Sequence, residues 1–129
     1  MAIFDKSNSI NTNSRNAILS ANKISLTMQE LNKEINYEFS EKIKFGIGIH
    51  AGNTIVGMMG YGSNVSETVV GDNVNIASRL ETLSKQFKCE LVVSKYVAIK
   101  ANMKTDDLLP KKVKIRGRKD SLEIFTFNK

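Results

Sequence analysis

The residues best suited to chemistry lie between Thr68 and Glu81, in the segment T-V-V-G-D-N-V-N-I-A-S-R-L-E. A helix that begins at Gly71 or Asp72 presents free backbone N–H groups, which favour a phosphate. Asn75 and Arg79 are four residues apart, so their side chains stack on one face of that helix, opposite its apolar positions. An amide beside a guanidinium forms a fixed set of donors for an oxyanion. The alternative is a solvated face on which Arg79 pairs with an acid, and spacing alone favours that alternative.

A second cationic group lies near the end of the chain, where residues 111–119 contain six basic residues in nine. On a strand, four of the basic side chains would share one face while Val113 and Ile115 point inward. These four are Lys112, Lys114, Arg116 and Arg118. Such a row suits phosphate binding, and it equally suits an edge strand that charge protects from aggregation. A nucleic-acid partner is not expected, because the chain has no Trp and its few Phe residues sit mostly at core positions.

The glycine-rich segment Gly46–Gly52 reads G-x-G-x-x-x-G, which does not match the dinucleotide fingerprint G-x-G-x-x-G. We expect Gly46 and Gly48 to clear one face of a strand for another backbone or a ligand. The single histidine, His50, is more often a half-buried strand residue than a base. Without a second histidine, no nucleophile with its base is indicated, which excludes most hydrolase chemistry.

The composition indicates one domain whose partners are anionic. The chain has 129 residues, of which 41% are apolar and 25% charged, with a net charge of +6. One cysteine and one histidine exclude an internal disulfide and a Cys/His zinc site. No apolar run approaches the ~20 residues that span a bilayer, and the start does not read as a signal peptide, so a cytoplasmic setting is expected.

Hydrophobic periodicity predicts the elements that position these residues. The first half should hold a strand at 1–4, a polar loop at 7–16 and an amphipathic helix to residue 35, capped by Asn13 or Ser14. The apolar face of that helix consists of Ala17, Ile18, Ala21, Ile24, Met28, Leu31 and Ile35. Alternation predicts a strand from Ile43 to Ala51, and the break at 52–53 predicts a hairpin with a strand at 54–59.

In the second half, a short strand at 68–70 should precede the helix of Asn75 and Arg79, which runs to Phe87. The residues expected to be buried on that helix are Val74, Ala77, Leu80, Leu83 and Phe87. A strand at 91–93, a helix at 94–101 and two strands at 113–116 and 122–127 follow. This pattern predicts one α+β domain with antiparallel hairpins.

Three ordered motifs resemble the class III nucleotidyl cyclase catalytic domain. They are G-I-G-I-H-A-G from Gly46 followed by Val56-Gly57, the segment 68–81, and the closing pair V-K-I-R-G-R and L-E-I-F-T-F. Met1–Phe4 is similar to the strand that follows the metal hairpin of the family. The resemblance covers essentially the whole chain.

The resemblance implies conversion of ATP to 3′,5′-cyclic AMP and pyrophosphate, with Mg²⁺ or Mn²⁺, in a head-to-tail dimer. It implies that Asn75 orients the ribose and that Arg79 stabilises charge on the α-phosphate. Arg116 takes the place of a lysine on the terminal phosphates. Thr68 falls at the position that reads the purine, which leans towards ATP.

The same resemblance implies that the two metal-binding aspartates and the purine-selecting lysine belong before the position of Met1. Residues 1–129 are therefore expected to be a partial domain: a truncated ferredoxin-like fold, mostly an antiparallel sheet with helices packed on it. We expect no metal bound by the known motif and negligible activity of the chain alone. Because a central strand would be missing, association as a homodimer or with another cyclase subunit is expected. The alternative is a non-catalytic module that binds a nucleotide or a partner.

Overall fold

A mixed four-stranded sheet organises the computed structural model, which describes residues 1–5, 7–35 and 41–128. The strand order is β1-β4-β6-β5, with β1 parallel to β4 and the other pairs antiparallel. The bounds are β1 (Ile47–Ile49), β4 (Leu91–Ser94), β5 (Lys111–Lys114) and β6 (Ser121–Phe127). In this register Ile47 lies opposite Leu91, and Val113 lies opposite Leu122.

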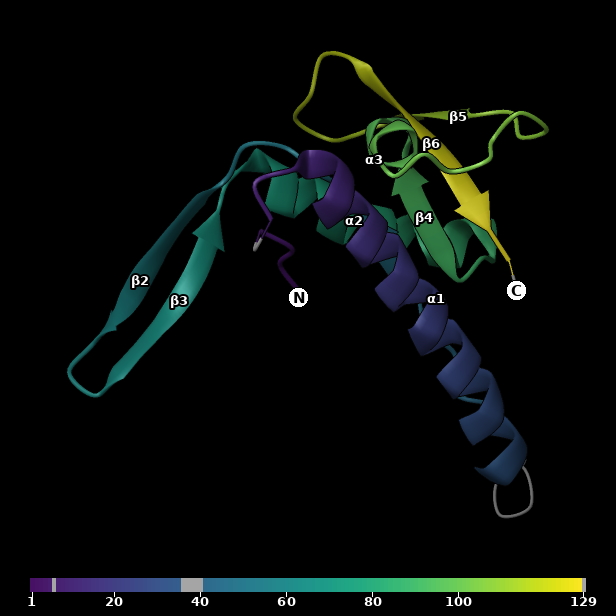
Figure 1. Cartoon of the computed structure of the whole chain (residues 1–129), viewed down its shortest axis with the longest axis horizontal. Helices are drawn as coiled ribbons and strands as arrows, with labels where there is room; N and C mark the ends of the chain where they lie inside the picture. Colours follow the sequence, from purple (N-terminus) through teal and green to yellow (C-terminus); the bar gives the residue numbers. More distant parts are fainter. Residues whose placement is uncertain (6, 36–40, 129) are drawn as a thin grey trace.

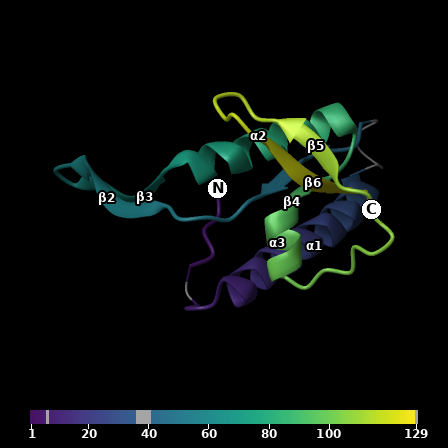
Figure 2. The same ribbon diagram turned by 90° about the horizontal axis from the view of Figure 1, so that it is seen from above.

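Helices cover both faces of this sheet (Figure 2). On one face lies α2 (Asp72–Phe87), and on the other lie α1 (Ile10–Ile35) and α3 (Lys95–Lys100). Alternate residues of the strands therefore enter two separate cores. Towards α2 the buried residues are Ile76, Leu80, Cys89, Val92, Ile115 and Ile124. Towards α1 and α3 they are Ile18, Ala21, Leu91, Val93, Val97, Ala98, Ala101 and Phe125.

A second, two-stranded sheet extends away from this body (Figure 1). It is an antiparallel hairpin of β2 (Ile55–Tyr61) and β3 (Asn64–Val70), which turns at Gly62 with a left-handed φ of 62°. Every residue of β2 is exposed. This differs from the predicted hairpin of residues 43–51 with 54–59, because β1 instead pairs parallel with β4.

The N-terminal predictions are partly wrong. Met1–Phe4 forms no strand and is exposed. The expected loop at 7–16 contains the start of α1, because the polar side chains there satisfy the helix end. The Ser9 hydroxyl accepts from the Thr12 amide at 3.4 Å, so Ser9 takes the capping place, and the predicted caps Asn13 and Ser14 lie inside the helix. The Asn13 side chain instead exchanges hydrogen bonds with the backbone of Ser7, before the helix, at 3.1 and 2.8 Å.

The buried face of each long helix matches the prediction in part, since Ala17, Ile18 and Ala21 of α1 and Leu80 of α2 are buried as expected. In α1 it consists of small residues and Ile18, whereas Ile24 and Leu31 are exposed, because the second half of the helix extends beyond the sheet (Figure 1). In α2, Ile76 is fully buried and Val74 is only half-buried. The predicted strands at 91–93 and 122–127 and the helix at 94–101 are confirmed to within a residue or two.

Candidate functional site

Arg79 and Arg116 are brought together between α2 and the turn that follows β5. The Arg79 guanidinium donates a hydrogen bond to the backbone carbonyl of Arg116. Asn75 lies one turn earlier on the same face of α2 and is exposed. The predicted acid partner of Arg79 is not what the structure shows, since its described partner is a main-chain carbonyl. A guanidinium has five N–H donors, so Arg79 retains donors for a ligand.

The turn at 115–118 is held against α2 from two sides. Its first residue, Ile115, is 3% exposed and packs in the core with Ile76 and Leu80. On the surface, Arg118 pairs with Asp72 at 3.6 Å. Since Asp72 and Arg79 both come from α2, the turn that carries Arg116 contacts this helix at two points on the surface.

The basic row of the sequence is therefore divided. Val113 is half-buried and Ile115 buried, as predicted, but β5 ends at Lys114. Arg116 and Arg118 lie in the turn, beside α2, rather than on a strand face with Lys112. Because β5 is at the edge of the sheet, its lysines also fit a charged edge that resists aggregation.

The N-terminus of α2 has the open geometry expected for an anion site. Its N-cap, Gly71, has a φ of 153° and gives no side-chain cap, although its backbone carbonyl accepts a hydrogen bond from the Val74 amide at 3.2 Å. The Asp72 carboxylate in the first turn opposes an incoming anion, although its ion pair with Arg118 offsets this charge.

Thr68 lies on β3 opposite Gly57, three residues before Gly71. Its side chain is half-buried. In the part of the chain that the structure describes, its side chain makes no hydrogen bond to Asn75, Arg79 or Arg116. Asn75, Arg79 and Arg116 are therefore clustered, whereas Thr68 is near them in the sequence and forms no hydrogen bond with them among the described residues.

His50 belongs to the same end of the molecule, which the sequence did not indicate. It is half-buried immediately after β1, and its Nε2 lies 3.0 Å from Oδ1 of Asn73. Burial is the main cause that lowers its pKa, opposed by the Asn73 hydrogen bond. Spacing could not find this pair, because the two residues are 23 positions apart and belong to different elements.

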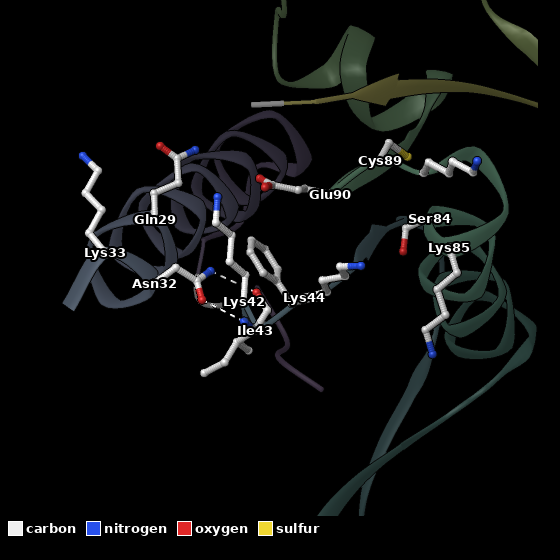
Figure 3. Close-up of a pocket in the computed structure, with 12 residues that line it drawn as sticks. Gln29, Asn32, Lys33, Lys42, Ile43, Lys44, Ser84, Lys85, Cys89 and Glu90 are labelled. Carbon is white, nitrogen blue, oxygen red and sulfur yellow. Dashed lines mark hydrogen bonds between the residues drawn. The ribbon is translucent and has the colours of Figure 1, made fainter. Parts of the chain in front are cut away.

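A larger hollow lies at the opposite end of α2 (Figure 3). Its volume is about 1020 Å³. Two hydrogen bonds, at 2.8 and 3.0 Å, join the Asn32 side chain of α1 to the backbone of Ile43, which also lines the hollow. Several lysines line it, but Lys33 and Lys85 point away from its centre. None of the four predicted site residues lines this hollow.

A divalent metal does not fit the residues described. Within residues 1–5, 7–35 and 41–128, no three His, Cys, Asp or Glu side chains come together as ligands.

Of the helices in these ranges, none has the length and apolar character of a membrane span.

Comparison with known proteins gives a consistent match. A family model described as the adenylate and guanylate cyclase catalytic domain matches residues 1–129. The chain is 36% identical over 89 residues to an adenylate cyclase of Anabaena cylindrica, covering 65% of this chain. It is 32% identical over 78 residues to adenylate cyclase 1 of Rhizobium meliloti (strain 1021), covering 60% of this chain. It spans only 17% and 12% of the length of these two relatives.

Two solved structures share the fold. The crystal structure of the guanylyl cyclase Cya2 superposes with a TM-score of 0.80 over 95% of this chain and 61% of that chain, at 22% identity. A bacterial light-regulated adenylyl cyclase superposes with a TM-score of 0.63 over 88% of this chain and 34% of that chain, at 21% identity. The predicted α+β fold of the ferredoxin-like cyclase type is thereby confirmed.

Proposed function

This chain belongs to the adenylate and guanylate cyclase catalytic domain family, and from that premise we propose that it supplies the ribose and phosphate side of an ATP-cyclising site. The observation that carries the proposal is the contact between the Arg79 guanidinium and the Arg116 carbonyl. It holds two cationic residues and Asn75 at one place on the surface of α2.

In the proposed reaction, the ribose 3′-hydroxyl of ATP attacks the α-phosphorus. The new O–P bond closes the 3′,5′-cyclic monophosphate, the bond to the β-phosphate oxygen breaks, pyrophosphate leaves, and the hydroxyl proton passes to solvent. Arg79 neutralises charge that develops on the α-phosphate. Asn75 holds the ribose, Arg116 meets the terminal phosphates, and Thr68 contacts the purine and favours ATP over GTP.

The site is proposed to be composite. Divalent Mg²⁺ or Mn²⁺ supplies charge neutralisation at the phosphates in this family, but the described residues offer no ligand set for it. The metal is therefore expected on a second cyclase subunit. Residues 1–129 are accordingly a partial catalytic domain, inactive alone.

The β2–β3 hairpin is the surface that we assign to that subunit. It projects from the body and exposes large apolar side chains, among them Ile55 at 75%, Met58 at 69% and Tyr61 at 94% (Figure 1). An apolar patch of this kind marks an interaction surface. Since β3 leads directly into α2, the base of the hairpin adjoins the end of α2 that carries Asn75.

The test mixes this chain with a cyclase subunit that keeps its metal aspartates but lacks its own transition-state arginine. We expect cyclic AMP from the mixture in the presence of Mn²⁺ and ATP. Arg79→Ala should lower the rate by about 10² to 10³, as expected for loss of one charge-stabilising group. Arg15→Ala, an exposed arginine on α1, is the matched control and should leave the rate unchanged.

Two outcomes would contradict the proposal. Cyclic AMP made by the pure chain would show that the site is not composite. No cyclic AMP above background from the mixture would favour the second candidate, a non-catalytic module that binds ATP or a partner. That candidate draws on the lack of a metal ligand set among the described residues, and it predicts ATP binding that EDTA does not change.

A further inference from the structure

Three polar residues form a continuous hydrogen-bonded chain at the base of the hairpin. The side-chain nitrogen of Asn73 donates to the backbone carbonyl of Asn53 at 2.7 Å. Because a carbonyl only accepts, the amide oxygen of Asn73 must face the other way, towards Nε2 of His50 at 3.0 Å. His50 therefore carries its proton on Nε2. Its other nitrogen, Nδ1, is buried and has no hydrogen-bond partner among the residues that the structure describes.

These hydrogen bonds join three segments that are far apart in the sequence. His50 follows β1, Asn53 lies in the connection to β2, and Asn73 is the second residue of α2. The packing there is tight, since a Cβ on Gly52 would lie 2.5 Å from Cγ of Asn73.

The returning end of the hairpin meets the same place. A Cβ on Gly71 would lie 3.7 Å from Thr54. Both ends of the hairpin therefore converge on the first turn of α2.

We infer that His50 and Asn73 are positioning residues, which lock the base of the β2–β3 hairpin to the first turn of α2 and thereby set where Asn75 and Arg79 stand. The inference rests on the proposed function, in which Asn75 and Arg79 hold the nucleotide. It extends that function by linking the hairpin surface to the nucleotide site through named side chains.

The lock requires neutral His50. A second proton would have to go on Nδ1, which faces no acceptor in the described structure and is shielded from water. The charged groups that act on His50 are Asp72 of α2 and Arg118 of the turn after β5, and they act in opposite directions. Burial and Arg118 lower the pKa of His50, whereas Asn73 and Asp72 raise it. Acid should therefore loosen the lock.

The first experiment uses the unmodified chain and NMR. Long-range ¹H–¹⁵N spectra should show His50 with a protonated Nε2 and a bare Nδ1 at neutral pH. On acidification, backbone amides of residues 53–55 and 72–79 should shift with the same midpoint as the His50 ring. The opposite tautomer, or titration of the ring with no shift in residues 74–79, would overturn the inference.

Variants then separate positioning from simple stability. Asn73→Ala removes both hydrogen bonds and should weaken ATP binding about fivefold, as for loss of one ordinary hydrogen bond. His50→Gln keeps a donor near the Nε2 position without a titrating ring. It should bind ATP as the wild type does at neutral pH and should bind more tightly than the wild type in acid. Asn16→Ala, at an exposed position of α1, is the control and should change nothing.

The outcomes distinguish this inference from the proposed function. If the mixture with the complementing cyclase subunit makes no cyclic AMP, the proposed function fails, and the coupled NMR titration alone decides the lock. If the wild type binds ATP and Asn73→Ala binds it equally well, the proposed function stands and the positioning role is refuted.

Discussion

Replacing Gly48 with alanine should force α2 off the sheet. A Cβ at this position would lie 2.8 Å from the carbonyl carbon of Leu80, and nearer still to the backbone of Ala77 and Glu81. Ordinary contact begins at 3.4 Å, so the shortfall at Leu80 alone is 3.4 − 2.8 = 0.6 Å. All three obstacles are helix backbone, which cannot rotate away as a side chain can.

This displacement of α2 should lower the free energy of unfolding strongly, because the helix cannot tilt without exposing the side chains that it buries against the sheet. Ile76 and Leu80 are fully buried on its inner face. We expect Gly48→Ala to lower the free energy of unfolding by about 3 kcal/mol, the upper end for overpacking. With a urea m-value of about 2 kcal/mol/M, the midpoint would fall by about 1.5 M. ATP binding should weaken as well, because α2 carries Asn75 and Arg79.

Gly57→Ala provides a matched control. Gly57 lies on the exposed strand β2, and an added Cβ there meets nothing within 4 Å. Alanine in a strand is favoured over glycine, so this variant should match or slightly exceed the wild type in stability. Urea unfolding followed by far-UV circular dichroism measures both. If the two variants unfold within about 0.5 kcal/mol of each other, close approach of α2 to β1 is not what Gly48 provides.

Three further predictions concern single interactions. Gly46→Ala should lower the free energy of unfolding by about 1 to 2 kcal/mol, because the added Cβ would meet the Ser84 side chain. Adding Ser84→Ala to the same chain should recover part of this loss in urea unfolding, and an equal loss with and without Ser84→Ala would contradict the explanation. Ser94→Ala should cost about 1 kcal/mol, since the buried Ser94 hydroxyl caps α3 by accepting from the Val97 amide at 3.5 Å, and a wild-type midpoint would refute the cap. Because the pKa of His50 is lowered in the folded state, the unfolded chain binds the extra proton first as the pH falls. The contribution of His50 to the free energy of unfolding is therefore full above about pH 6.5 and is lost as the pH drops through the folded pKa. His50→Gln should remove this pH dependence from unfolding curves measured at several pH values, and an unchanged pH dependence would contradict it.

Local sequence patterns predicted the elements whose burial is simple. The strands at 91–93 and 122–127 are central in the sheet, so a run of β-branched and aromatic residues identifies them. The helix from Asp72 was predicted by its glycine and its apolar period, although the period alone placed Val74 inside and missed Ile76.

Pairing between strands was less accessible. The run from Ile43 to Ala51 alternates well, yet only Ile47–Ile49 forms a strand, and it pairs with β4 rather than with the next segment. Alternation shows that a strand has two faces and carries no information about which strand lies beside it. In the same way, a regular helical period does not show whether a neighbour covers the apolar face. Ile24 and Leu31 follow the period of α1 and are nevertheless exposed, because their half of the helix extends past the sheet.

The types of the candidate site residues were determined by the sequence alone. An amide and a guanidinium four residues apart share a helix face wherever the helix is placed, so Asn75 and Arg79 followed from local geometry. Only the tertiary structure decided what those side chains meet. The Arg116 carbonyl lies 37 positions from Arg79, and His50 lies 23 positions from Asn73. Such contacts depend on how α2 settles on β1, because close packing across glycines, and not local spacing, brings these distant segments together.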